Sequence, residues 1–466
     1  MKPDTRPIFL LPIILVLVSC QALIPRQSPT PEVKSIERNL IEKPLPGALS
    51  TETPVPTVTY SPTSTQEQPT ATQSVTGTPT QTQIPLSEQQ SIFDDLWNVV
   101  NDTYVYPDFN GVDWNSTKQE ISEKISAGLS TEDFYREMKD LIISLGDDHS
   151  YYLDPQEVAA QDAEYEGSHD YVGIGIYVSA VPERARAVII SVFPNSPAEQ
   201  AGLQPRDSIL SVDGTPILDE DGYLRDIVRG PEGTSIAITV QTPGEQPREM
   251  RLTRQRITST YPVTHQVITT PEGMHIGYVF LLTFMDGTVD EQVADALKEM
   301  NIDEPLDGLI IDNRMNEGGS SLVLEPMLGY FTSGTLGYFV RHSTETPLKI
   351  KLNDVNNSAE VPMVVLVGSG TASFGEIFSG ILQDTGRAYV IGTTTDGNVE
   401  ILWGYDFEDG SELWLANETF RPANHTEQDW EQSGIVPDLT VPAGYDEYTF
   451  QTDPLILAAV QYFSNQ

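Results

Sequence analysis

The sequence contains a single cysteine, Cys20, in 466 residues. One cysteine excludes an intramolecular disulfide, and its place near the N-terminus excludes thiolate catalysis or a cysteine-based zinc site in the rest of the chain. Histidine is also scarce: there are six, and none has the spacing of paired metal ligands. We therefore expect no metal and no cofactor, and a fold stabilised by buried apolar area.

Basic side chains are few, with 26 Lys and Arg against 68 Asp and Glu. Residues 1–87 hold six of each sign, so the net charge of −42 falls on residues 88–466. The resulting field repels nucleic acid and anionic lipid surfaces, and neither is expected as a partner of this part. With 39% hydrophobic residues the chain can form two or three packed domains of roughly 100–200 residues each.

The N-terminal residues have the pattern of a targeting segment. Lys2 and Arg6 precede an apolar run from Ile8 to Val18, which is followed by Ser19 and Cys20. The run is short for a membrane-spanning helix, and its end has the form of a lipobox. We expect residues 1–19 to be a lipoprotein signal peptide and Cys20 to be acylated, which would anchor the chain to the membrane at the outside of a bacterial cell. An uncleaved anchor helix is the alternative.

Residues 20–86 are expected to form a disordered linker. From Gln27 to Pro85 the sequence consists largely of Pro, Thr, Ser and Gln with few aromatic residues. Such a segment cannot bury enough surface to offset the entropy of ordering it.

Residues 87–166 read as a helical segment. Ser87 to Gln90 predicts a capping box ahead of a helix with Ile92 and Leu96 on one face. A second helix is predicted from Ser130 to about Gly146, and the stretch Asp147–Pro155, which includes His149, is predicted to be a loop.

Residues 167–257 alternate in the manner of short strands, with short helices predicted at Ser196–Gly202 and Gly222–Val228. Together with the run Gly173-Ile174-Gly175-Ile176, this pattern resembles a PDZ domain. The resemblance implies that the Gly173–Ile176 loop binds the C-terminal carboxylate of a peptide, which then adds to the edge of the sheet.

Residues 258–466 alternate strands with helices, which predicts an α/β core. Buried strands are expected at Ile276–Phe284, Gly308–Asp312 and Pro362–Val367, with helices at Val289–Met300, from Ser321 onward, and from Ser373 to about Gly386.

Two junctions in this core are suited to nucleophilic catalysis. Ser373 stands where a buried strand turns into a helix, whose N-terminus supplies unpaired N–H groups. Gly318 and Gly319 follow the neighbouring strand, and one of their N–H groups together with that of Phe374 could bind an oxyanion. Taken singly, the Ser373 junction favours an ordinary N-cap and the glycine pair favours a simple turn; the two junctions together favour a catalytic site.

The ordered set of motifs is similar to the C-terminal processing (tail-specific) serine peptidases. The motifs are Leu145–Pro155, the PDZ segment, Asp312–Gly319, Thr371–Ile377 and Gly434–Asp438. The resemblance implies a crotonase- or ClpP-like catalytic core, an inserted PDZ domain and an N-terminal helical segment. It also implies that Ser373 is the nucleophile, that Gly318 or Gly319 and Phe374 bind the oxyanion, and that substrates are proteins or peptides with exposed C-termini.

The chain departs from that family at the general base, because Asn398 stands where the family has lysine and no lysine follows Lys351. The segment around His149 resembles the tricorn-type relatives, which use a histidine from this loop. That resemblance implies His149 as the base and Glu431 as a functional carboxylate. Those relatives have serine where this chain has Asp148, to which we assign no role.

Two functional interpretations follow. In the first, the chain is a serine endopeptidase with His149 as the base. In the second, loss of the lysine marks an inactive relative that still captures C-terminal tails.

Overall fold

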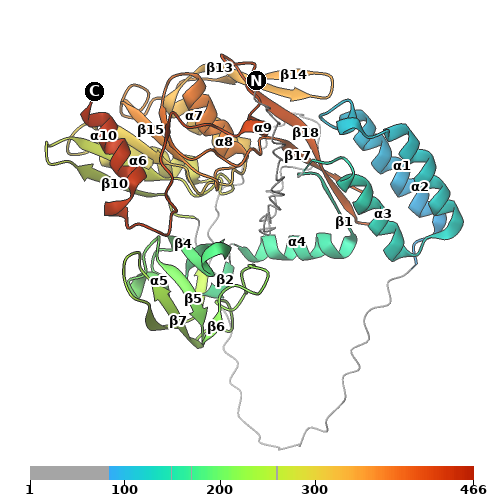
Figure 1. Ribbon diagram of the computed structural model, residues 1–466, viewed down its shortest axis with the longest axis horizontal. Coiled ribbons are helices and arrows are strands. Elements are labelled where there is room, and N and C mark those ends of the chain that lie inside the picture. The colour runs from blue at the N-terminus through green and yellow to red at the C-terminus, as the bar shows by residue number, and fades with distance from the viewer. Residues whose placement is uncertain (1–82, 148, 169, 259–260) are drawn as a thin grey trace, which may run out of the picture. The chain divides into compact units, whose positions relative to one another are not determined.

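The computed structural model describes residues 83–147, 149–168, 170–258 and 261–466 (Figure 1). The signal peptide, Cys20 and nearly all of the expected linker lie outside the described residues, as does Asp148. The described chain divides into two units. The helical unit contains residues 83–158 and 402–417, and the sheet unit contains residues 159–401 and 418–466.

The helical unit is built around three helices and short strands. Its elements are α1 (Leu86–Thr103), the 3₁₀ turn η1 (Phe109–Gly111), α2 (Trp114–Gly128), α3 (Thr131–Ile143), β1 (Tyr151–Leu153), the start of α4 (Pro155–Ser168), most of β17 (Ile401–Asp406) and the first part of β18 (Glu412–Pro422). Ser130 caps α3 as predicted, because its side chain accepts the Asp133 N–H. The predicted capping box at Ser87 is wrong: α1 starts at Leu86, two residues earlier than a Ser87 N-cap implies, and its N-cap is Pro85.

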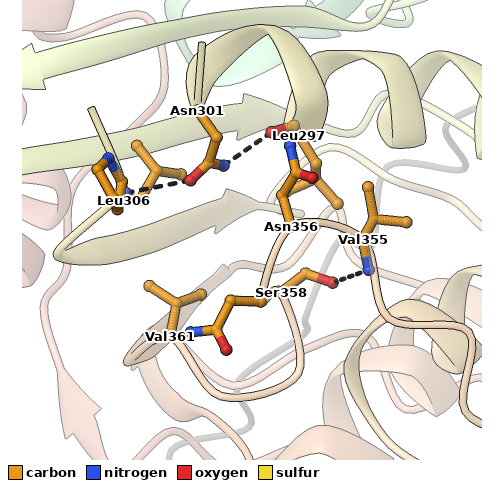
Figure 2. A pocket seen from close by; sticks show the side chains of 9 residues that line it. Leu297, Asn301, Leu306, Val355, Asn356, Ser358 and Val361 are labelled. Carbon is orange, nitrogen blue, oxygen red and sulfur yellow. Dashed lines mark hydrogen bonds between the residues drawn. The ribbon is translucent and has the colours of Figure 1, made fainter. Parts of the chain in front are cut away.

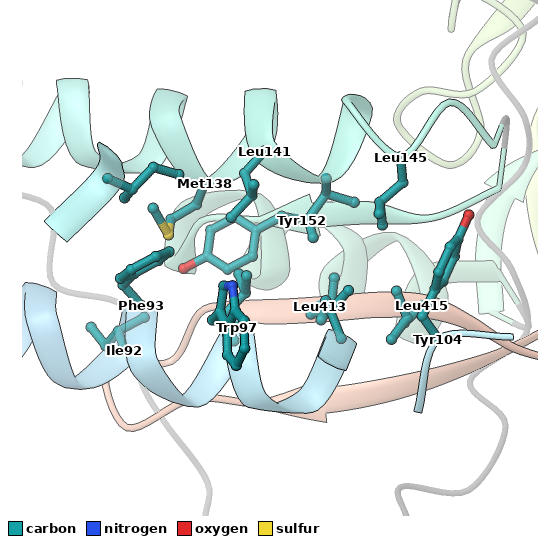
Figure 3. Packing of buried hydrophobic residues seen from close by; sticks show 14 of the residues in the cluster. Ile92, Phe93, Trp97, Tyr104, Met138, Leu141, Leu145, Tyr152, Leu413 and Leu415 are labelled. Carbon is teal, nitrogen blue, oxygen red and sulfur yellow. The ribbon is translucent and has the colours of Figure 1, made fainter. Parts of the chain in front are cut away.

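Residues 402–417 belong to the helical unit, although we expected them in the core. The strand β1, within the segment predicted to be a loop, pairs antiparallel with β18, so that Tyr152 faces Leu413. Figure 3 shows Leu413 near Trp97 of α1 and Leu415 near Tyr104, which follows that helix; all four belong to one buried cluster. Burying side chains of this size contributes roughly 1.5–3 kcal/mol each, which explains why this strand packs on the helices.

The sheet unit contains a six-stranded sheet in the order β10-β11-β12-β15-β16-β19. All neighbours from β11 onward are parallel, and β10 is antiparallel to β11. The strands are β10 (Thr264–Thr269), β11 (His275–Phe280), β12 (Gly308–Asp312), β15 (Met363–Val367), β16 (Tyr389–Gly392) and β19 (Leu439–Thr440). Every residue of β12 and β15 is buried, as expected of parallel strands covered on both faces.

Helices cover both faces of this sheet. On one side Leu455, Ile456 and Phe463 of α10 share a buried cluster with Ile310 and Val364. The remaining elements are α6 (Val289–Met300), α7 (Ser321–Phe331), the hairpin β13 (Gly334–Arg341) and β14 (Glu345–Ile350), α8 (Phe374–Asp384), α9 (Trp430–Ser433), η3 (Phe450–Thr452) and α10 (Pro454–Ser464). The predicted bounds of α6 and β12 agree with the structure, and the predicted helix after Ser373 is α8.

The PDZ-like module is inserted ahead of β10. A ribbon of β2 (Asp170–Gly173) and β9 (Gln255–Thr258) joins its two ends. Between them lies a sheet in the order β3-β4-β5-β7-β8, with β6 paired to β5. Its elements are β3 (Ile176–Val181), η2 (Pro182–Arg184), β4 (Arg186–Val192), α5 (Pro197–Gln200), β5 (Ser208–Val212), β6 (Thr215–Pro216), β7 (Ser235–Gln241) and β8 (Arg248–Thr253).

The helix predicted at Gly222–Val228 is wrong, since this stretch forms turns and one isolated bridge. The physical reason lies in the bonds to the preceding segment. The Arg225 N–H donates to the Ile217 carbonyl and the Tyr223 carbonyl accepts the Asp219 N–H, both at 2.9 Å, so the backbone groups of this stretch are paired without a helix.

Candidate active site

Three loops leave the carboxyl ends of neighbouring parallel strands and meet at one edge of the sheet. Residues 313–320 follow β12, residues 368–373 follow β15, and residues 393–400 follow β16. Because parallel strands end at the same edge, these loops lie at the edge where open α/β sheets bind ligands. Ser373, Gly318 and Asn398 are brought together in this way.

Ser373 occupies a strained turn at the start of α8. Its φ of 52° and ψ of −128° lie in a region that non-glycine residues rarely adopt, at a cost of order 1–3 kcal/mol. Its N–H donates to the Asn398 carbonyl at 2.7 Å, and the preceding Ala372 N–H donates to the Asn316 carbonyl at 3.0 Å. Although Ser373 is the N-cap residue, its side chain makes no capping hydrogen bond. The ordinary N-cap interpretation therefore does not describe this serine.

Gly318 lies directly against Ser373. A Cβ placed on Gly318 would come within 2.7 Å of the Ser373 Cβ, 2.9 Å of the Phe374 nitrogen and 3.0 Å of the Ser373 Oγ. The Phe374 N–H is the first of α8 and has no acceptor within the helix. Gly319 is packed instead against Phe284, whose carbonyl carbon would be 2.2 Å from an added Cβ. Only glycine fits at either position.

A buried amide relay supports this loop, and sequence analysis did not identify it. The Asn313 side chain donates to the Gly375 carbonyl and to the Ser379 Oγ, both at 2.8 Å. Asn316 donates to the Asn313 Oδ1 at 2.8 Å, and its own Oδ1 accepts the Gly318 N–H at 2.9 Å. The relay ties the glycine loop to α8.

Two carboxylates hold the loop that follows β16. Glu376 accepts hydrogen bonds from the Thr395 hydroxyl and from the N–H groups of Gly397 and Asn398. Glu431, on α9, accepts the N–H groups of Val399 at 2.7 Å and Glu400 at 3.1 Å. Glu431 is thus placed against the loop that contacts Ser373. Glu376 lies within the Thr371–Ile377 motif, and no role was predicted for it from the sequence. Its position three residues after Ser373, where a capping box has its glutamate, could have indicated a structural role.

His149 belongs to the helical unit, whereas Ser373 belongs to the sheet unit. The His149 N–H donates to the Asp147 Oδ1 at 3.0 Å, and Asp147 also accepts the Tyr104 hydroxyl at 2.7 Å. The carboxylate that organises the backbone of this segment is therefore that of Asp147.

The Gly173–Ile176 loop is anchored inside the PDZ-like module. The carbonyls of Ile174 and Gly175 accept the N–H groups of Ala198 and Phe193 at 2.9 and 3.0 Å. Gly175 has a φ of 80°, and a Cβ there would lie 2.2 Å from that of Ser196. Beside this loop, β3 forms an edge of the module's sheet.

Figure 2 shows a small cavity of about 40 Å³ elsewhere in the sheet unit. It lies between the end of α6, including Leu297 and Asn301, and the turn around Ser358. None of the candidate site residues lines it, and its volume suits a water molecule rather than a peptide.

A strained serine at a strand-to-helix turn, next to a glycine loop and a free helix N-terminus, defines a nucleophilic hydrolase of α/β architecture. Comparisons with known proteins agree with this class. Residues 275–441 match peptidase family S41, residues 188–242 match the PDZ domain, and residues 85–142 match the tricorn protease C1 domain.

Two relatives and one solved structure illustrate the similarity. The carboxyl-terminal-processing protease of a Synechocystis species is 30% identical over 386 residues, covering 81% of this chain and 86% of the relative. The chloroplastic carboxyl-terminal-processing peptidase 2 of Arabidopsis thaliana is 28% identical, covering 78% of this chain and 72% of the relative. The solved photosystem II D1 C-terminal processing protease shares the fold with a TM-score of 0.54 and 24% identity, covering 76% of this chain and 93% of that one.

The chain belongs to the S41 family of carboxyl-terminal-processing serine peptidases and carries a PDZ domain. Among the described residues, no helix is both long and apolar enough to cross a membrane.

Proposed function

We propose that this chain is an extracytoplasmic serine endopeptidase, anchored by a lipid at Cys20, that cleaves proteins whose C-terminal tails bind the PDZ domain. The observation that carries the catalytic part is the Ser373 turn, where an uncapped hydroxyl lies against Gly318 and the Phe374 N–H. The anchor and the extracytoplasmic location rest on the sequence of residues 1–20.

In the proposed reaction, the His149 imidazole takes the proton from the Ser373 Oγ, which attacks the carbonyl carbon of the scissile peptide bond. The carbonyl oxygen gains the negative charge and is stabilised by the Phe374 N–H with that of Gly318 or Gly319. The imidazolium then protonates the leaving amine as the C–N bond breaks. Water, deprotonated by His149, hydrolyses the acyl-enzyme and releases Ser373.

The Gly318 N–H already donates to the Asn316 Oδ1, so a substrate oxygen would have to replace that acceptor. Glu431 would act by holding Val399 and Glu400, and through them the loop that binds Ser373.

The second candidate is a tail-binding protein without peptidase activity. It is favoured by Asn398, because an amide cannot act as a base in place of the family lysine.

The test is hydrolysis of an unfolded protein with an apolar C-terminal tail by the wild type and by Ser373→Ala. We expect the wild type to cleave and the variant to be inactive while still binding the tail. Tail binding without cleavage by the wild type would establish the second candidate. Partition into a detergent phase that is lost in Cys20→Ala would support the lipid anchor; equal partition would refute it.

A further inference from the structure

The carboxylate of Glu376 binds the loop that holds Ser373, the candidate nucleophile. Glu376 lies in the first turn of α8, three residues after Ser373, and is fully buried. One oxygen accepts the Thr395 hydroxyl and the Gly397 N–H at 2.9 Å, and the other accepts the Asn398 N–H at 2.7 Å. The loop is thereby attached to α8 by three donors.

This arrangement differs from an ordinary capping box by one inserted residue, Asn398. In a capping box, a glutamate at this position accepts the N–H of the N-cap residue. Here the Ser373 N–H donates instead to the Asn398 carbonyl at 2.7 Å, and Glu376 accepts the N–H of the same Asn398. The strained backbone of Ser373 is therefore fixed by a loop residue whose own position depends on Glu376.

The charge state of Glu376 decides whether all three donors are satisfied. Burial raises the pKa of Glu376 to about 7, against the lowering effect of the Thr395, Gly397 and Asn398 donors. Asp396, on the same loop, raises this pKa further. When the carboxyl is protonated, the oxygen that carries the proton becomes a donor, and an N–H of the loop loses its acceptor.

We propose that Glu376 is a positioning residue for catalysis, whose carboxylate holds the 395–398 loop so that the Asn398 carbonyl fixes Ser373 in its reactive turn. This inference rests on the proposed function of Ser373. Glu376 is buried and acts through the 395–398 loop rather than on the reacting atoms.

The test compares Glu376→Gln and Glu376→Asp with the wild type, and uses Glu291→Gln, an exposed residue of α6, as the matched control. In Glu376→Gln an amide group faces an N–H, so we expect kcat to fall about tenfold or more with KM within about twofold. Glu376→Asp should recover part of the rate, and the control should keep all of it.

The pH profile separates this role from a merely structural one. If both Glu376 and the general base must be deprotonated, log(kcat/KM) of the wild type falls with a slope of about two at low pH. Glu376→Gln should fall with a slope of about one, and Glu376→Asp should keep the steeper slope. Unchanged kcat and slope in a folded Glu376→Gln protein would overturn the proposal.

Hydrogen exchange makes the test independent of peptidase activity. The amides of Ser373, Gly397 and Asn398 should lose protection in Glu376→Gln but not in the control. Equal protection in the two variants would overturn the role of Glu376 even if Ser373 proves to be the nucleophile. If the wild type has no peptidase activity but Glu376→Gln still shows reduced amide protection, the proposed function is rejected. The role of Glu376 in holding the 395–398 loop would then stand.

Discussion

At the scale of single residues, the site depends on positions where only one side chain fits. Gly318 has a φ of 95°, and an added Cβ would press on the Cβ and Oγ of Ser373. Ser373, Gly318 and Phe374 could be proposed from the sequence because strand-to-helix junctions can be recognised locally. The Asn313–Asn316 relay could not, because these bonds depend on the approach of α8, some 60 residues further along the chain.

Gly318→Ala is expected to lower kcat/KM about 100-fold, because the methyl group would displace Ser373 or the Phe374 N–H that is proposed to bind the oxyanion. Gly287→Ala is the matched control, since an added Cβ there meets nothing within 4 Å. The measurement is steady-state hydrolysis of a short peptide, with thermal melting to verify folding. Equal activity of the two variants would contradict the assigned position of Gly318.

At the scale of elements, a buried ionic network joins the PDZ-like module to the core within the sheet unit. Arg206 binds Asp453, the N-cap of α10, at 2.6 Å. Arg314 binds Asp453 at 2.8 Å and Asp312, at the end of β12, at 2.6 Å. Burial acts to raise the pKa of Asp453, but the Arg314 and Arg206 guanidiniums outweigh it and hold this pKa below its ordinary value.

Arg206→Met should destabilise the sheet unit by about 3–5 kcal/mol, because it leaves a buried carboxylate with one cation fewer. Arg229→Met, an exposed residue of the same module, should cost less than about 1 kcal/mol. Because the Asp453 pKa is depressed, the stabilisation is present above the unfolded value of 3.8 and is lost as the pH falls through the folded pKa. The free energy of unfolding of both variants is measured by denaturant unfolding at pH 7 and below pH 4. Equal losses of stability in Arg206→Met and Arg229→Met at pH 7 would refute the prediction.

Helices and strands were predicted correctly where their own residues determine them, and wrongly where contacts with other segments do. The bounds of α6 and β12 follow from helical periodicity and a continuous apolar run. The strand Tyr151–Leu153 was missed because three residues form a strand only when a partner, here β18, pairs with them from some 260 residues away. The helix predicted at Gly222–Val228 does not form because the backbone of Tyr223 and Arg225 pairs with Asp219 and Ile217 of the preceding segment.

At the scale of the whole molecule, the proposed function assigns tail binding to the PDZ-like module and cleavage to the peptidase core. The PDZ-like module and the peptidase core belong to one unit, with Val188 and Ile190 of β4 in the same buried cluster as Ile310 of β12. The Gly173–Ile176 loop would recognise a free carboxylate through backbone N–H groups.

Substrates that differ only at the terminal carboxylate should therefore separate the two steps. We expect a protein ending in a free carboxylate to be cleaved with a KM about tenfold lower than the same protein ending in an amide. A peptide too short to reach the PDZ-like module should be cleaved equally well whether it ends in a free carboxylate or in an amide. Measured KM values that do not differ between the two protein substrates would show that the module does not read the carboxylate.

In the proposed reaction, the His149 imidazole replaces the family lysine in activating Ser373. The most direct measurement is the rate at which a fluorophosphonate labels Ser373 in the wild type, His149→Ala and Ser373→Ala between pH 5 and 9. We expect a wild-type rate that rises with pH through about 6 to 7, and almost no labelling in either variant. Labelling of His149→Ala at the wild-type rate, or a wild-type rate that does not change over this pH range, would contradict it.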